Sequence, residues 1–215
     1  TVWWLLKQLY NKDLLYKGYT IQPYSPKAGT GLSSHELNQP GTYRDVSDTT
    51  VVAQFKVKKF SENLESKISA LGSDFHILAW TTTPWTLPSN TALAVGRDIE
   101  YVLVKTFNQY TFEPINIILA RPLLEKQFGK KFVEGTDEDF ANYTAESKTI
   151  PYQVLAEFTG EDLAGTTYEQ LIPWFLPAEN PEKAFRVIIG AFVTTAAGAG
   201  IVPLAPTLAA AATTG

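Results

Sequence analysis

The sequence predicts a mixed α/β fold, in which a β-barrel core is decorated with short helices. Short runs of β-branched, aromatic and other apolar residues recur along the chain, and Gly, Pro, Asn and Asp separate them. This pattern is typical of strands joined by turns. Stretches with apolar residues at helical spacing are few by comparison. Many short strands with few helices therefore indicate a sheet-based core.

Length and composition limit what the chain can be. With 215 residues, of which 45% are hydrophobic and 13% aromatic, it can bury the core of one elaborate domain with a small appendage. Cysteines are absent, which excludes disulfides and a Cys-ligated metal, and the two isolated histidines argue against a His-based site. We expect this domain to need no cofactor.

Charge and hydropathy narrow the classes of partner. The net charge is −4 and no extended Lys/Arg cluster occurs, which argues against a stand-alone nucleic-acid binder. We find no signal peptide and no apolar stretch long enough to span a bilayer, so we expect a soluble protein without a membrane partner. The missing start methionine and the Ala/Thr tail at 208–215 suggest a fragment excised from a larger polypeptide.

The first 47 residues read as a separate segment. Apolar residues at positions 2, 5, 6, 9, 10, 14 and 15 predict an amphipathic helix over 2–15, which Gly18 ends. Residues 19–24 predict a short strand, and residues 25–34, rich in Pro, Gly and Ser, predict a loop. We place the boundary in the loop region 35–47, which gives a segment 1–47 and a main domain 48–215.

The main domain predicts a succession of strands. Apolar and polar residues alternate from Ala53 to Lys58 within 49–60, which marks a strand with one buried face. Further strands are predicted at 75–80, 91–95, 101–107, 116–120, 152–158, 185–193 and 201–202. A short helix is predicted at 121–128, with Pro122 near its first turn, and the acidic stretch 134–146 reads as a surface excursion.

The connection over residues 81–90, between two predicted strands, carries the strongest candidate site. Thr81, Thr82 and Thr83 supply hydroxyls and backbone N–H groups at one place, and Trp85 adds an apolar wall with one donor. Two prolines fix the path of the chain between them. These groups suit a small polar pocket. An ordinary Thr-rich strand end with a Pro-stiffened loop is the simpler alternative.

The order of residues in this connection resembles a known signature. Residues 80–92, WTTTPWTLPSNTA, resemble the threonine-rich signature of the editing domain of isoleucyl-tRNA synthetases, a connective insertion in their class I catalytic domain. Thr83 before Pro84 and Trp85 after it favour the isoleucyl member over the valyl and leucyl ones, which have a Thr-Thr-Arg-Pro variant. Segments at 2–10, 24–26, 29–36, 43–46, 200–202 and 205–206 look like the same family in the same order.

The resemblance implies a fold and a function. The fold is the class I synthetase editing-domain fold, with residues 1–47 as stalk from the catalytic-domain side and 48–215 as editing domain. The function is hydrolysis of valine mischarged on tRNA(Ile). The resemblance also implies two partners, the 3′ end of that tRNA and the catalytic domain of the same polypeptide. It implies ATP and Mg as cofactors only in the full-length enzyme, and a cytoplasmic location. Substrate-binding residues carried over by the motifs are Thr81, Thr82, Thr83, Trp85, Asn90, Gly200, Ile201 and Val202.

The sequence departs from the family where the chemistry is expected. The family's closing motif has a His that limits pocket size and, nine residues later, an Asp that holds the substrate's ammonium group. This chain has Pro203 and Ala212 at these two positions. A proline has no imidazole and an alanine cannot pair with a cation, so we expect editing to be weak. No residue is therefore assigned as catalytic. A degenerate, non-catalytic module that binds the tRNA acceptor end or has a structural role is the alternative, and an unrelated ligand-binding β-barrel is a remote third.

Four other features are weaker signals. His35 has no surrounding acid or nucleophile pattern, and His76 lies within a predicted strand, so packing or solvent roles are expected for both. The neighbours Glu161 and Asp162 face different directions on one turn, which favours capping over a carboxylate pair. The Gly-x-Gly at 198–200 is a poor phosphate signal, because no helix with capping residues follows it.

Overall fold

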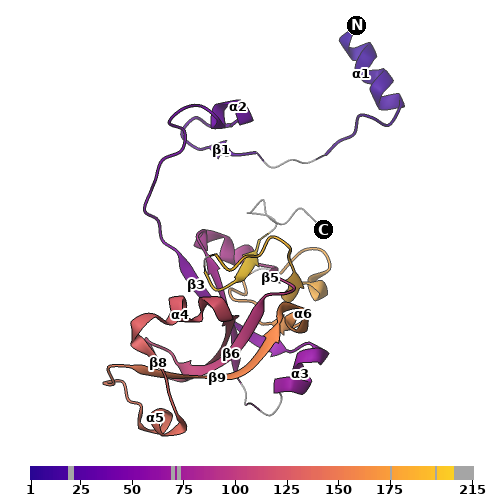
Figure 1. Cartoon of the computed structure of the whole chain (residues 1–215). Helices are drawn as coiled ribbons and strands as arrows, with labels where there is room; N and C mark the ends of the chain where they lie inside the picture. Colours follow the sequence, from indigo (N-terminus) through magenta and orange to yellow (C-terminus); the bar gives the residue numbers. More distant parts are fainter. Residues whose placement is uncertain (19–21, 69–70, 72–73, 175, 197, 206–215) are drawn as a thin grey trace. The chain divides into compact units, whose positions relative to one another are not determined.

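The fold is described from a computed structural model (Figure 1). It describes residues 1–18, 22–68, 71, 74–174, 176–196 and 198–205. The chain divides into two compact units, Thr1–Ser47 and Asp48–Gly215. Each unit is described by itself.

The first unit contains little regular structure. Helix α1 spans Val2–Asn11 and buries none of its residues, while β1 (Tyr24–Ser25) and β2 (Thr30–Gly31) form a short antiparallel pair. Helix α1 is shorter than the predicted 2–15, because Asp13 takes a positive φ of 55° that a right-handed helix cannot accommodate. Most of the predicted strand 19–24 falls on residues 19–21, which lie outside the described residues. A capping box of Ser33 and Glu36 starts helix α2 (Ser34–Leu37).

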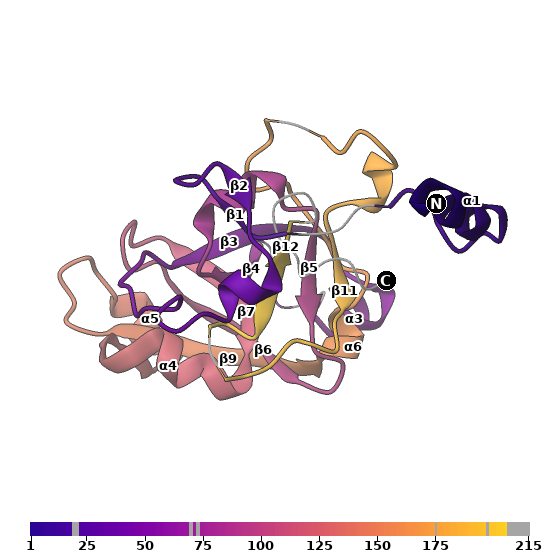
Figure 2. The ribbon, with the colours of Figure 1, turned by 90° about the horizontal axis from the view of Figure 1, so that it is seen from above.

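A ten-stranded sheet forms the second unit, in the order β12-β5-β11-β10-β3-β4-β7-β6-β9-β8. The pairs β5–β11, β4–β7 and β8–β9 are parallel and the other neighbours antiparallel, so the sheet is mixed, as predicted. The strands are β3 (Val51–Lys59), β4 (Phe75–Thr81), β5 (Ala92–Val95), β6 (Glu100–Phe107), β7 (Pro114–Ala120), β8 (Phe132–Glu134), β9 (Ile150–Thr159), β10 (Thr167–Tyr168), β11 (Arg186–Ile189) and β12 (Ile201–Leu204). Figure 2 shows β5, β11 and β12 side by side.

The closed barrel predicted from the sequence is not observed among the described residues. The hydrogen-bonded order has two separate ends, β12 and β8, and no described ladder joins them. Instead, the sheet curls so that its β12 end approaches β4, five positions along the same order. Strand β11 is also shorter than the predicted 185–193, because residues after Ile189 form turns.

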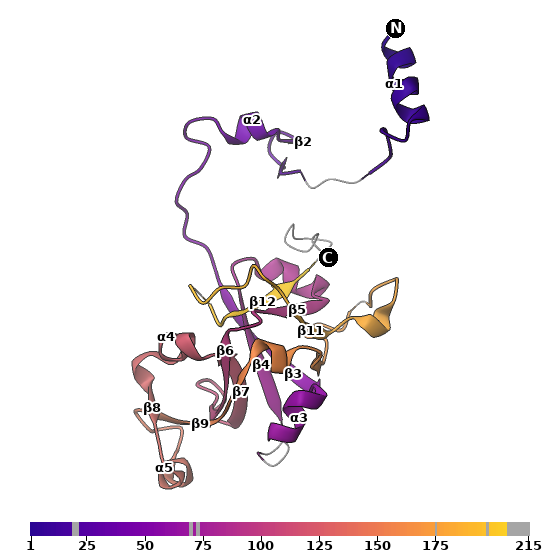
Figure 3. The ribbon, with the colours of Figure 1, turned by 45° about the vertical axis from the view of Figure 1, so that its right-hand side comes forward.

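Short helices decorate the sheet. They are α3 (Glu62–Ile68), η1 (Pro84–Ser89), η2 (Arg121–Leu123), α4 (Leu124–Phe128), η3 (Gly129–Lys131), α5 (Asp137–Asn142), α6 (Gly160–Leu163) and η4 (Pro181–Lys183). The predicted helix 121–128 is thus a 3-10 turn with Pro122, followed by α4. Helices α3 and α6 contact each other and both contact β9, whereas α4 lies near β8 (Figure 3).

Both faces of the central strands are buried. One face belongs to the main core, which includes Phe55, Ile77, Tyr101 and Leu103. The other face belongs to a second cluster, and the alternation along β4 places Leu78 there, next to Ile77 of the main core. The predicted alternation in β3 is confirmed at Ala53 and Phe55, which are buried, with Gln54, Lys56 and Lys58 exposed.

Candidate functional site

Strand β12 and the glycine turn before it lie against β4, the strand that ends at Thr81, although over 100 residues separate them in the sequence. A Cβ placed on Gly198 would lie 2.8 Å from the Cβ of Trp80, the residue before Thr81. A Cβ on Gly200 would lie 2.4 Å from the Cβ of Ala120 at the end of β7. Both glycines also have φ near +70°. Only glycine satisfies this close approach and this backbone conformation together.

Three hydrogen bonds hold the glycine turn. The backbone N–H of Ala120 donates to the carbonyl of Ala199 over 2.9 Å, and the amide Nε2 of Gln127 donates to that of Gly198 over 2.7 Å. The hydroxyl of Tyr101 donates to the Gly200 carbonyl over 2.8 Å. It also accepts from the N–H of Gly96 over 3.1 Å. Burial raises the pKa of Tyr101 to about 12, so its hydroxyl remains a donor at neutral pH.

The threonines bond to one another at the end of β4. Thr83 donates its backbone N–H to the Thr81 hydroxyl over 3.0 Å, and the hydroxyls of these two residues lie 3.2 Å apart. The hydroxyl of Thr86 donates to the Thr83 carbonyl over 2.7 Å. Thr81 and Thr86 are buried, whereas Thr83 is half-buried and Thr82 exposed. The hydroxyls accessible to a ligand are therefore those of Thr82 and Thr83.

Trp85 lies on the 3-10 helix η1, which begins at Pro84. Its side chain is 61% exposed, in contrast to the buried Thr86 and Leu87 that follow it. Pro84 suits the first position of the helix because its fixed φ matches the turn and its missing N–H would be unpaired there. The indole predicted to form an apolar wall is therefore exposed, two residues after Thr83 in the sequence.

Asn90 is buried and has a structural position. Its amide nitrogen donates to the carbonyls of Ala92 and Leu204, over 2.8 and 3.2 Å, and its oxygen accepts from the Tyr168 hydroxyl over 2.7 Å. It thereby links β5, β10 and β12, and its side chain is only 4% exposed. A direct contact with substrate does not fit this placement. Asn90 instead positions the strands on which the site is built.

Strand β12 continues from the glycine turn along β5. Ile201 is fully buried in the main core, whereas Val202 packs with Ala94 in a separate small cluster. Because side chains alternate along a strand, Pro203 shares the face of Ile201. Pro203 is half-buried and lies opposite Leu93 in the register. Ala212 lies outside the described residues.

The weaker sequence signals have ordinary structural roles. His35 lies 3.1 Å from the amide of Gln39, and His76 is half-buried within β4. Asp162 caps helix α6 together with Thr159, and its pairing with Lys67 and the N–H of Thr159 lowers the pKa of its carboxyl group. The capping role predicted for this pair of carboxylates is therefore confirmed for Asp162. A strand, β12, follows the Gly-x-Gly turn, as expected for a turn that is no phosphate loop.

Sequence reasoning missed the residues that fix the site from a distance. Gln127, Tyr101 and Tyr168 each bond to a residue more than 70 positions away. No local pattern marks such residues, since their role depends on which strands become neighbours. Among the described residues, no three His, Cys, Asp or Glu side chains are grouped so that they could hold a metal ion. Nor does that part of the chain contain a helix with the length and apolar character needed to cross a membrane.

Comparisons with known proteins show what the chain resembles. No family model matches it. It is 60% identical to the isoleucine–tRNA ligase of Bacteroides fragilis over 98% of this chain and 17% of that protein. It is 44% identical to the isoleucine–tRNA ligase of Clostridium tetani over 96% of this chain and 16% of that protein. The chain thus spans about a sixth of the length of these relatives.

Similar folds occur among solved structures. The crystal structure of GlLeuRS-CP1 superposes with a TM-score of 0.50 at 14% sequence identity, covering 74% of this chain and 55% of that one. At this identity the likeness concerns the fold alone. The described strands and helices therefore form a CP1-like mixed α/β fold.

Proposed function

We infer that this chain, which belongs in sequence to the isoleucine–tRNA ligase family, is the editing domain of such an enzyme and acts on valine esterified to the 3′ end of tRNA(Ile). The observation that carries this proposal is the approach of β12 and the glycine turn before it to β4, the strand that ends at Thr81. If these segments lay apart, one aminoacylated adenosine could not contact both. We assign residues 48–215 as the editing domain and residues 1–47 as the stalk toward the catalytic domain.

The need for such a domain follows from the small difference between the two amino acids. Valine lacks one methylene of isoleucine, which a hydrophobic pocket can discriminate by only about 1–3 kcal/mol, and isoleucine–tRNA ligase is itself the standard illustration of this limit. A second pocket that admits valine and excludes isoleucine by volume supplies the missing accuracy. Bound next to Thr83, the valine side chain would meet the face of β12 that carries Pro203.

Hydrolysis requires a water, a donor for the developing oxyanion and an anchor for the ammonium group. Water attacks the ester carbonyl, and the ribose oxygen leaves with a proton. In this chain the half-buried hydroxyl of Thr83, oriented by Thr81 and Thr86, is suited to donate to the oxyanion. The substrate's neighbouring ribose hydroxyl can orient the water. The exposed Trp85 ring offers a surface for the adenosine.

Two positions argue for slow hydrolysis. Pro203 lies on β12, where the resemblance implies a histidine, and Ala212 occupies the position implied for an aspartate. A charged hydrogen bond to the ammonium group contributes about 1.5–3 kcal/mol. Its loss corresponds to a factor of about 10–150 in binding. These two positions favour the second candidate function, a module that holds the tRNA acceptor end without cleaving the ester.

A deacylation assay with valine-charged tRNA(Ile) tests the proposal. We expect slow hydrolysis by the chain and a gain of at least about tenfold in the double variant Pro203→His, Ala212→Asp. Isoleucine-charged tRNA(Ile) serves as control and should remain intact in both proteins. Hydrolysis by the unaltered chain as fast as by a relative with both residues would refute the weakened site. A double variant that binds the charged tRNA without hydrolysing it would support the non-catalytic function.

The remaining assignments concern the full-length enzyme. ATP and Mg would be bound by the catalytic domain and would not be needed for hydrolysis here. The catalytic domain of the same polypeptide and the charged tRNA would be the partners, and the cytoplasm the location.

A further inference from the structure

Asn90 joins the two segments that the proposed function assigns to the substrate. It directly follows η1, the 3-10 helix whose N-cap is Thr83, and its backbone N–H donates to the carbonyl of Leu87 in that helix over 3.0 Å. Its side-chain Nδ2 donates to the carbonyl of Leu204, the last residue of β12, over 3.2 Å. One residue therefore ties the helix that carries the threonine side of the site to β12.

The hydroxyl of Tyr168 on β10 determines which way the carboxamide of Asn90 points. It donates to Oδ1 of Asn90 over 2.7 Å, while Nδ2 donates to the carbonyls of Ala92 and Leu204. The reversed carboxamide would bring Oδ1 against two carbonyl oxygens and would offer the hydroxyl an NH₂ group that cannot accept. Burial raises the pKa of Tyr168, so its hydroxyl remains a donor at neutral pH. Only one orientation of Asn90 thus satisfies all four groups.

The ring of Tyr168 is held independently of its hydroxyl. It packs edge-to-face against Phe55 and Phe185, with ring centroids 5.2 and 6.2 Å apart, and the residue is only 2% exposed. The substitution Tyr168→Phe therefore keeps this packing and removes a single oxygen atom. It leaves Oδ1 of Asn90 buried without its donor, which weakens the link between η1 and β12.

We propose that Tyr168 is a positioning residue for discrimination by size: acting through Asn90, it holds β12 in the place at which the strand excludes isoleucine. This inference rests on the proposed function, in which the valine side chain meets the face of β12 that carries Pro203. Leu204, the residue that Asn90 holds, directly follows Pro203. A larger side chain can enter only if β12 moves away from the threonine side, and the hydrogen bonds of this link oppose that movement.

The test measures binding of two adenosine analogues to the full chain by isothermal titration calorimetry. In these analogues valine or isoleucine is joined to the 3′ position by an amide, so neither is hydrolysed as an ester. The parent should bind the valyl analogue about 5- to 150-fold more tightly, the range expected for forcing one extra methylene into a packed site. Tyr168→Phe should lower this ratio about 2- to 13-fold, the contribution of one hydrogen bond, and leave the Kd of the valyl analogue nearly unchanged.

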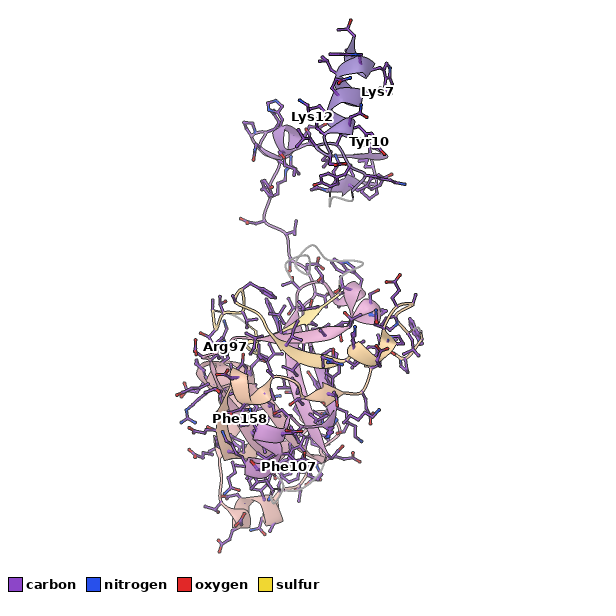
Figure 4. All side chains as sticks on the ribbon, turned by 90° about the vertical axis from the view of Figure 1, so that its right-hand side faces the viewer. Lys7, Tyr10, Lys12, Arg97, Phe107 and Phe158 are labelled. Atoms are coloured by element: carbon purple, nitrogen blue, oxygen red, sulfur yellow. The ribbon has the colours of Figure 1, made fainter. Side chains whose placement is uncertain are left out.

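The matched control is Thr106→Val, which also removes one buried hydroxyl. Thr106 lies on β6, is 2% exposed and donates to the carbonyl of Pro151 over 2.9 Å. Its neighbour Phe107, labelled in Figure 4, contacts Phe140 of α5, at the end of the unit away from β12. Thr106→Val should therefore destabilise the fold to a similar extent and leave the ratio of the two affinities unchanged.

Each outcome bears on the positioning role. A ratio that Tyr168→Phe leaves unchanged, or that Thr106→Val lowers equally, would overturn this role and leave the proposed function intact. Equal affinity of the parent for the two analogues would overturn it as well, because no discrimination by size would then exist. A parent that binds neither analogue would contradict the proposed function, and the positioning role with it.

Discussion

The substitution Gly200→Ala tests whether the close approach of the glycine turn to β7 determines the geometry of the site. The added methyl group would meet the Ala120 Cβ at 2.4 Å. Ala120 cannot rotate this atom away, because a Cβ is fixed to its backbone. Alanine at the φ of +70° seen for Gly200 costs about 1–2 kcal/mol. Overpacking adds about 1–3 kcal/mol. We expect a total loss of about 2–5 kcal/mol in the free energy of unfolding.

Gly165→Ala separates these two contributions. Gly165 has a φ of +88°, but the nearest atom to its Cβ would be the Ser61 Cβ at 4.0 Å, an ordinary contact. This variant should therefore lose only the backbone part, about 1–2 kcal/mol. The combination of Gly200→Ala with Ala120→Gly removes the clashing methyl group and should recover about 1–3 kcal/mol relative to the sum of the single effects.

Urea unfolding followed by circular dichroism measures all four proteins. For a chain of this size, each kcal/mol corresponds to about 2–4 °C in Tm, so thermal unfolding gives an independent reading. If Gly200→Ala is no more destabilising than Gly165→Ala, the steric argument is refuted. The same holds if the double variant shows no coupling. In either case the turn at 198–200 would not be packed against the end of β7 as described.

Three further predictions concern the groups that hold the site. Tyr101→Phe should lower the free energy of unfolding by about 1–3 kcal/mol in urea, because it leaves the Gly200 carbonyl and the Gly96 N–H without their buried partner. The exposed Tyr110→Phe should have no effect. Asn90→Ala should lower the free energy of unfolding by about 2–5 kcal/mol, since three buried hydrogen bonds are lost. The same substitution at the exposed Asn63 should leave this free energy unchanged. Equal effects of the two substitutions would contradict the linking role of Asn90. Asp162→Asn should reduce the loss of stability on acidification. The lowered pKa of the Asp162 carboxyl group stabilises the fold above the ordinary value of 3.8, and this stability is lost as pH falls through the folded pKa. A parent protein whose urea midpoint stays unchanged from neutral to acidic pH would refute this prediction.

The sequence was sufficient for most strands but not for the closure of the sheet. Alternation in β3 and apolar runs in β4, β6 and β7 are local signals, and these strands occur where they were predicted. Whether the ends of a sheet meet depends on curl and on which strands pair, and no local pattern encodes this. The helix predicted at 2–15 ends early for a similar reason. Its apolar spacing continues to Leu15, but the backbone turns at Asp13.

For the site, sequence patterns located the segments but not the role of each side chain. The threonine run was found from its residue types, and Gly200, Ile201 and Val202 from the resemblance to the family's motifs. Asn90 belongs to the same run of residues, yet its amide is used up in hydrogen bonds to Ala92, Leu204 and Tyr168. Ile201, predicted to contact substrate, is a core residue with 1% exposure. Burial of this kind depends on partners that are distant in the chain.

Pro203 has a further consequence because β12 is the outermost of the described strands on its side of the sheet. An outermost strand offers unpaired backbone groups to any other extended chain, and a proline there is one of the means by which proteins discourage intermolecular strand pairing. Replacing it with histidine restores a backbone N–H as well as an imidazole. The added imidazole would then come with a greater tendency to self-associate, so preparations of that variant should be compared with the parent at matched low concentration.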